Sequence, residues 1–258
     1  MEQTEKKHQF PSEEVTLPSK GLLYPEGSPL RSGVIEMKYM TAREEDILTN
    51  QNYIKNGTVI DKLLQSLILS PINYNDLLIG DKNAVLVASR ILGYGADYSF
   101  TINHPQTNEM ETITVDLTNA EDKIIDESLM KEGKNEFEFI LPTSKKTLTF
   151  KLLTQADDKK IEAELKGLRK INKNSSPELT TRMKHLILSV EGDYEKKTIR
   201  QFVDTQLLAI DARALRIYLS DIQPDINLDF DVEFEDGHIQ EGVTVPINAN
   251  FFWPDVEL

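Results

Sequence analysis

Histidines and carboxylates are the side chains of this chain best suited to acid–base or metal chemistry. The 258 residues contain four histidines, His8, His104, His185 and His238, and no cysteine. His104 and His238 lie in or near two short turns, NHPQTN and EDGHIQ, which occupy similar places in the two halves of the chain. A zinc ribbon places its ligands in turns of this kind, but one histidine per turn without cysteine supplies too few ligands. We therefore expect no metal site.

Adjacent acidic residues are frequent in this chain and give little indication of catalysis. The pairs Glu44–Glu45, Glu121–Asp122 and Asp157–Asp158 occur among 43 acidic residues. Two of the three begin predicted helices, where carboxylates interact favourably with the helix dipole. The GYG of residues 93–95 lacks the glycine spacing of a nucleotide-binding loop, and no hydrolase, zinc-protease or phosphate-loop motif occurs. We expect no catalytic residue, cofactor or small-molecule substrate; an enzyme with an unfamiliar site is the alternative.

The composition excludes further classes of function. The net charge of −14 and the pI of about 4.8 argue against a nucleic-acid-binding protein, which needs a basic surface. No apolar run approaches the roughly 18 residues of a membrane span. The polar N-terminal sequence has no signal-peptide pattern, so we expect residues 1–12 to form a flexible arm. The lack of cysteine suits a reducing cytoplasm.

The order of segments suggests that the chain consists of two similar halves. KYMTAREEDIL, which starts at Lys38, resembles KLLTQADDKKI, which starts at Lys151, and each has a threonine three residues before an acidic residue. That spacing is typical of a capped helix N-terminus. Four more pairs follow the same order: VTLPSKG (15–21) with FILPTSKK (139–146), SLILS (66–70) with HLILS (185–189), LLIGDKNAVL (77–86) with LLAIDARALR (207–216), and the hairpin beyond each. The preserved order favours an ancient duplication.

The predicted fold is α+β, with two similar domains, residues 13–132 and 133–258, each with β-hairpins flanking a small helical cluster. Alternating apolar and polar residues in DYSFTIN and ETITVDL predict a half-buried hairpin. Asp81 is the expected N-cap of a helix that ends at Gly93 or Gly95. Apolar periodicity and capping patterns predict these helices: 42–55, 59–69, 82–93, 156–171, one opening at Ser176–Pro177, and one around 198–221.

Two apolar segments are candidate interaction elements. Leu22, Leu23 and Tyr24 lie in a proline- and glycine-containing loop that the second half lacks. Phe251, Phe252 and Trp253 lie beyond the duplicated unit, and aromatic side chains of this kind often anchor interfaces. In each case, packing against the chain's own domain is the alternative. We expect the tail to complete the last strand of the second domain, with Phe251 or Phe252 inward and Trp253 facing a partner.

Three segments carry a family resemblance: LPSKGLLYPEGSPL, VIEMKYMTAREEDIL and KLLQSLI, between residues 17 and 68. They resemble the baseplate hub subunit family of T4-like contractile-tailed bacteriophages. The resemblance covers most of the chain, is strongest over 15–68 and 243–254, and is weak over 120–200. Some relatives carry cysteine pairs in the hairpin turns, where this chain has none.

The resemblance implies a non-enzymatic structural protein of the viral tail baseplate hub. Its partners would be other phage baseplate or hub proteins, without nucleic acid or membrane. It would be located in the virion, and in the host cytoplasm during tail assembly. The alternative is an assembly chaperone for the hub that is absent from the finished particle.

Overall fold

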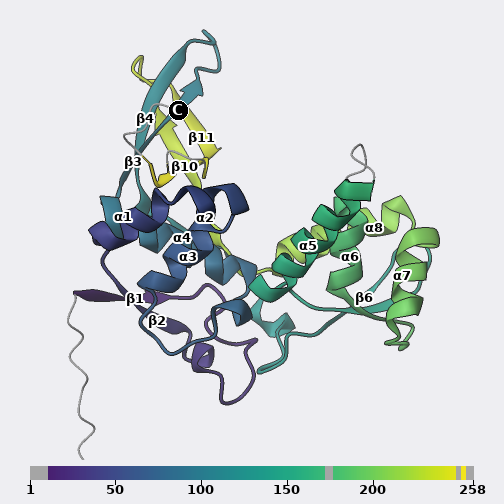
Figure 1. The fold of residues 1–258 in the computed structure, drawn as a ribbon. Coiled ribbons are helices and arrows are strands. Elements are labelled where there is room, and N and C mark those ends of the chain that lie inside the picture. The colour runs from purple at the N-terminus through teal and green to yellow at the C-terminus, as the bar shows by residue number, and fades with distance from the viewer. Residues whose placement is uncertain (1–10, 172–176, 248–250, 254–258) are drawn as a thin grey trace, which may run out of the picture.

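A computed structural model of the chain describes residues 11–171, 177–247 and 251–253. The fold is mixed α+β, and 43% of these described residues are helical and 24% lie in strands of small sheets. Two lobes lie side by side, and a pair of β-hairpins rises from the first (Figure 1). The coarse fold class predicted from the sequence is therefore confirmed.

The first lobe begins with a hairpin and continues with four helices. Strand β1 (Ser12–Thr16) pairs antiparallel with β2 (Val34–Lys38). The helices, with two short 3-10 turns, are as follows: η1 (Pro29–Ser32), α1 (Ala42–Leu48), α2 (Gln51–Asn56), α3 (Val59–Leu67), η2 (Tyr74–Asp76) and α4 (Ile79–Tyr94). The single helix predicted over 42–55 is wrong, because the Asn50 side chain accepts hydrogen bonds from the backbone of Asn52 and Tyr53 and starts a new helix.

Helix α4 (Ile79–Tyr94) starts three residues earlier than the predicted 82–93. Asp81 lies inside its first turn, fully buried, and is not the N-cap. Its carboxylate accepts hydrogen bonds from the Ser19 backbone N–H (2.9 Å), the Ser19 hydroxyl (2.7 Å) and the Tyr24 hydroxyl (2.6 Å). Through these hydrogen bonds, Asp81 links the start of α4 to the loop after β1. Of the two predicted ends, Gly93 and Gly95, the helix uses Gly95, whose φ is 85°.

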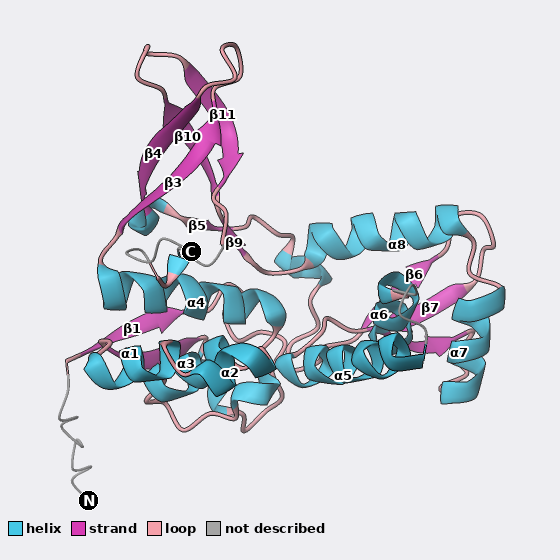
Figure 2. Ribbon diagram, turned by 45° about the horizontal axis from the view of Figure 1, so that its top comes forward, coloured by secondary structure: helices cyan, strands magenta, loops and turns pink. Residues whose placement is uncertain are grey.

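Four strands form a projecting unit that we call the hairpin pillar. It consists of β3 (Asp97–Asn103) paired with β4 (Met110–Asp116), and β10 (Asp229–Glu233) paired with β11 (Ile239–Thr244). The two hairpins stand together in both views (Figure 2). The Tyr98 hydroxyl donates to the Pro246 carbonyl (3.0 Å), and the Glu235 N–H donates to the Glu111 carboxylate (3.0 Å).

The final hairpin therefore lies with the first half of the chain, whereas the sequence assigned it to a domain of residues 133–258. The crossing segments are short: η3 (Leu117–Asn119), β5 (Glu121–Asp122), η4 (Glu127–Leu129) and β9 (Ile226–Asn227). Strand β5 pairs antiparallel with β9, with Glu121 opposite Asn227. Because β9 pairs beside the first hairpin, the strands that follow it pack there too.

The second lobe places helices around a three-stranded sheet. Its strands have the order β6 (Phe137–Ile140), β7 (Thr147–Phe150), β8 (Ile187–Val190), all antiparallel. Its helices are α5 (Gln155–Ile171), α6 (Glu178–Leu186), α7 (Lys196–Thr205) and α8 (Ala209–Ile222). The helix predicted over 198–221 is thus two helices, and the break lets both Phe202 and Leu215 reach the core. Pro177 precedes α6 at the N-cap, while Ser176 lies outside the described residues.

The two lobes share a continuous apolar core. One cluster of buried side chains includes Leu63 and Leu77 of the first lobe and Phe150, Leu152 and Leu215 of the second. At the junction, the backbone of Pro224 lies directly against Gly80 in α4. A Cβ atom at Gly80 would lie 1.7 Å from the Pro224 carbonyl oxygen, so only glycine permits this approach.

Two glycine substitutions in helices are expected to have opposite effects on stability. Gly80→Ala forces the backbones of α4 and Pro224 apart, which should lower the free energy of unfolding by about 3 kcal/mol. Gly167→Ala, on the open side of α5 with no atom within 4 Å of the new methyl group, should raise it by about 0.5–1 kcal/mol. Urea unfolding followed by circular dichroism measures both. A Gly80→Ala variant as stable as the wild type would contradict the close approach.

Candidate functional site

The apolar loop after β1 packs against its own lobe. Leu23 and Tyr24 are buried, with 2% and 4% of their surfaces exposed, and Leu22 is half-buried. The Tyr24 hydroxyl donates to Asp81 and accepts from the Leu78 N–H (2.9 Å). Burial, together with the neighbouring Asp81 carboxylate, raises the pKa of Tyr24. An interface that uses Leu23 or Tyr24 would require this loop to open, and the residues that it now exposes are Pro25, Glu26 and Gly27.

The aromatic tail also packs within the chain, but against the first lobe. Phe251 and Phe252 are inward, as predicted for one of them, with 0% and 2% of their surfaces exposed. The Phe251 ring contacts the Tyr98 ring edge-on at a centroid distance of 5.1 Å. The indole of Trp253, half-buried, donates to the Leu48 carbonyl at the end of α1 (3.2 Å). The expectation that this segment completes the last strand of the second domain is wrong, because β11 ends at Thr244.

Phe251→Ala is expected to weaken the attachment of the tail and the pillar to the first lobe. Removal of a fully buried phenyl ring leaves a cavity beside Tyr98 and should cost about 3–5 kcal/mol. Ile247→Ala, at a side chain that is 44% exposed, is the control and should cost less than about 1 kcal/mol. Thermal and urea unfolding give both values. Equal effects of the two substitutions would show that the tail is not docked as described.

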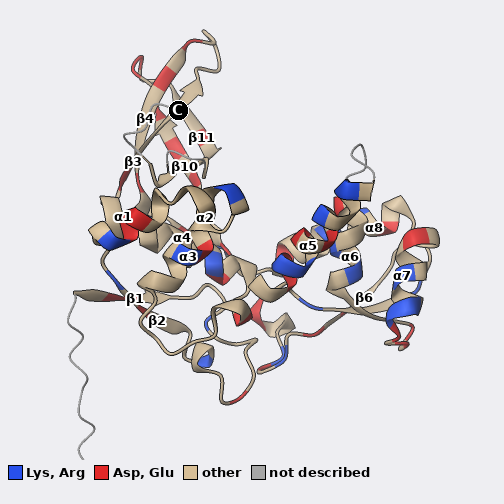
Figure 3. Ribbon diagram, in the orientation of Figure 1, with Lys and Arg blue, Asp and Glu red and all other residues tan. Residues whose placement is uncertain are grey.

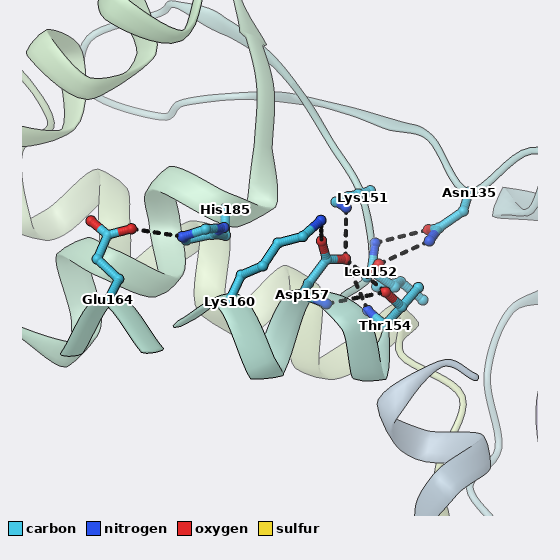
Figure 4. A network of polar contacts seen from close by, with 8 residues as sticks. All are labelled: Asn135, Lys151, Leu152, Thr154, Asp157, Lys160, Glu164 and His185. Carbon is cyan, nitrogen blue, oxygen red and sulfur yellow. Dashed lines mark hydrogen bonds and ion pairs between the residues drawn. The ribbon is translucent and has the colours of Figure 1, made fainter. Parts of the chain in front are cut away.

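The start of α1 and the start of α5 carry the same polar arrangement. Glu44 accepts hydrogen bonds from the Lys38 ammonium (2.7 Å), the Thr41 N–H (3.0 Å) and the Ser66 hydroxyl (2.7 Å). In the second lobe, Asp157 accepts from the Lys151 ammonium (2.6 Å) and the Thr154 N–H (3.1 Å), as Figure 4 shows. The helix starts predicted at Thr41 and Thr154 are confirmed.

The hydrogen bonds that Glu44 accepts lower the pKa of its carboxyl group. Burial alone would raise its pKa, but the hydrogen bonds from Lys38, Thr41 and Ser66 outweigh burial and lower the pKa of Glu44 to about 2. The same balance lowers the pKa of Asp157, where burial is opposed by Lys151 and Thr154. A carboxyl group with a depressed pKa stabilises the fold above its unfolded pKa, and this contribution disappears as the pH falls through the folded pKa.

Glu44→Gln is therefore expected to have a pH-dependent effect. At pH 7 it should lower the free energy of unfolding by an amount on the order of 2 kcal/mol. The difference from wild type should shrink as the pH falls from about 4.5 towards about 2, where Glu44 itself becomes neutral. Glu45→Gln, at the exposed neighbour, should change stability by less than about 0.5 kcal/mol throughout. Urea midpoints at several pH values test this, and a constant difference would refute it.

A cationic cleft lies beside the Lys151–Asp157 pair, between α5, α6 and α7. Its volume is about 460 Å³. Its polar lining consists of Lys151, Asp157, Lys160, Lys184, His185, Tyr194, Lys196 and Arg200. Lys184 is paired with Asp204 (2.6 Å), and His185 Nε2 lies 2.9 Å from the Glu164 carboxylate. Within the described ranges, no ion pair is made by Lys196 or Arg200.

The cleft was not predictable from the sequence because the negative net charge of the whole chain concealed it. Its residues come from four segments between 151 and 200, and no run of them stands out in the sequence. Counted over the second lobe alone, Lys and Arg outnumber Asp and Glu, which the net charge of the whole chain does not show. The arrangement presents several ammonium and guanidinium groups to one concavity, so it is suited to binding carboxylate or other anionic groups.

The two turn histidines meet at the end of the hairpin pillar. His104 is buried, and its Nδ1 accepts from the backbone N–H groups of Gln106 and Thr107 (both 3.2 Å). The ring of His238 lies 5.4 Å from that of His104, and Asp236 Oδ2 lies 3.4 Å from His104 Nε2. Over the residues with a described placement, no cluster of three or more possible ligands is arranged to hold a metal ion. His8 lies outside them.

A scan against protein-family models and searches of curated proteins and of solved structures found no match to this chain. None of the described helices is both long and apolar enough to cross a membrane. The features that bear on function are therefore its own surfaces: the closed loop, the docked tail, the pillar and the cationic cleft.

Proposed function

We propose that the protein is a non-enzymatic structural subunit of a phage tail baseplate hub that binds neighbouring baseplate proteins. The sequence resemblance over 15–68 and 243–254 supports the family. The structural role is supported by the hydrogen bonds and the ion pair that join the two lobes at their junction. A scaffold subunit must hold its binding surfaces at a fixed separation, and a stiff junction does so.

Asp61 of α3 lies at the centre of this junction. Its carboxylate accepts from the Gln155 side-chain amide (3.0 Å) and lies 3.4 Å from the Lys159 ammonium, both on α5. Backbone bonds reinforce it: the Ile79 N–H donates to the Leu153 carbonyl (3.1 Å), and the Gln155 N–H donates to the Leu77 carbonyl (2.8 Å). The start of α5 is thus fixed to the first lobe at several points.

The second lobe also exposes aliphatic side chains that a partner would cover. Ile140 of β6 is 64% exposed, and Ile210 and Ile217 of α8 are 62% and 52% exposed. Large exposed apolar side chains on ordered elements are typical of protein–protein contacts. This supports a role in assembly.

An ancient duplication is part of the proposal. It is supported by the equivalent Lys38–Glu44 and Lys151–Asp157 pairs. A second equivalence lies at the starts of α4 and α8, where Asp211 accepts from the Thr143 and Ser144 N–H groups as Asp81 accepts from Ser19. In both halves the acid binds the turn that contains the LP motif. Similar local bonds at equivalent places in the sequence follow naturally from a repeated ancestor.

Quantitative mass spectrometry of purified phage particles and of the infected-cell lysate tests the proposed function. A structural subunit is expected at a fixed copy number in particles, in constant ratio to known hub proteins. Protein abundant in lysate but missing from particles would contradict this role and favour the hub assembly chaperone. Loss of particles on deletion, restored by the wild-type chain, would be the control for specificity.

A further inference from the structure

The two ends of the molecule carry opposite charge. The pillar segments, residues 97–116 and 226–247, contain ten Asp and Glu and no Lys or Arg. Residues 137–222, which build the second lobe, contain 16 Lys and Arg and 12 Asp and Glu. Figure 3 shows acidic residues alone along the pillar, and basic residues concentrated on the helices of the second lobe. A protein of net charge −14 thus has a lobe of net charge +4.

The tip of the pillar combines acidic and apolar side chains. The exposed acids near the two turns are Glu109, Glu233, Glu235, Asp236 and Glu241. Beside them, Met110 is 74% exposed and Ile239 is 60% exposed. Such a surface offers carboxylates for charge pairing and two apolar side chains for burial.

The cleft of the second lobe has the complementary character. Its cations are Lys151, Lys160, Lys184, Lys196 and Arg200, and the acids that face or adjoin them are Asp157, Glu164, Glu195 and Asp204. Lys151 and Lys184 pair with Asp157 and Asp204, whereas in the part of the chain that the structure describes Lys196 and Arg200 make no ion pair and form the cationic edge of the cleft. Tyr194, 60% exposed, and Leu188 add apolar surface to the same cleft.

We propose that the acidic tip of the pillar of one copy binds the cationic cleft of a second copy. The pillar rises from the first lobe, whereas the cleft lies in the second, and the two are well apart in both views (Figures 1 and 2). The pillar of one copy therefore does not occupy the cleft of the same copy. The contact is head-to-tail, and copies joined this way form a ring or an open chain. At physiological salt, charges are screened over about 8 Å. Ion pairs in direct contact therefore still attract, whereas the repulsion between the two acidic molecules as a whole is weakened.

Sedimentation velocity with paired charge reversals tests this contact. The cleft variant is Lys196→Glu with Arg200→Glu, and the pillar variant is Glu233→Lys with Glu235→Lys. We expect the wild type to self-associate at 50 mM NaCl, and each variant alone to associate at least about tenfold more weakly. An equimolar mixture of the two should associate again, because the reversed cleft of one matches the reversed pillar of the other.

A control variant, Arg169→Glu with Lys170→Glu, makes the same change in charge on α5 outside the cleft lining, and should associate like the wild type. Circular dichroism confirms folding of each variant.

Wild type that stays monomeric at about 100 µM in 50 mM NaCl would overturn the proposal. So would a mixture that fails to recover association. Binding of an octaglutamate peptide without self-association would also overturn it, and would assign the cleft to an acidic segment of another protein. The test does not depend on the proposed place of the protein in a phage tail.

Discussion

The hydrogen bonds of Asp61 fix how the two lobes meet, and the rest of the architecture depends on that junction. Asp61 interacts with Tyr74 and Lys82 in its own lobe and with Gln155 and Lys159 in the other. Burial alone would raise the pKa of Asp61, but Lys82, Tyr74 and Lys159 outweigh burial and lower it. The carboxylate is therefore charged at neutral pH and binds donors from both lobes at once. Loss of a half-buried charge of this kind leaves its partners unpaired, which usually costs more than the pair itself contributes.

The junction also determines where the chain ends. Once α5 is fixed to the first lobe, the segment after α8 passes Gly80, and Asp225 accepts from the Asn83 side-chain amide (3.0 Å). Strand β9 then pairs with β5, which places the last hairpin beside β3 and β4. The tail that follows contacts Tyr98 and Leu48 of the first lobe. The C-terminal segment thus comes back to the first lobe, where Phe251 and Phe252 are buried. Residues from the far end of the sequence therefore complete the core of that lobe.

Local features were predictable from the sequence, whereas long-range ones were not. The alternation around Tyr98 and Phe100 predicted the first pillar hairpin, because sheet burial has a period of two residues. The capping threonines predicted two helix starts for a similarly local reason. Asp81 looked like an N-cap because sequence alone does not reveal that Ser19 and Tyr24, about 60 positions earlier, supply its hydrogen bonds. The pairing of β9 with β5 across more than 100 residues had no local signal, and the cationic cleft was concealed by the total charge.

The proposed duplication explains why the two halves differ where they do. Positions that determine the local fold carry the same chemistry in both, as in Glu44 with Lys38 and Asp157 with Lys151. Surface charge does not follow this equivalence in the helical parts: residues 41–95 contain 5 Lys and Arg and 6 Asp and Glu, whereas residues 151–222 contain 14 and 11. A packed helix start tolerates few changes, because an unpaired buried charge is costly. Exposed positions tolerate many, so charge can diverge there without loss of stability. Two copies of one framework can in this way acquire helices of different surface charge, so that the second lobe offers a cationic surface that the first does not.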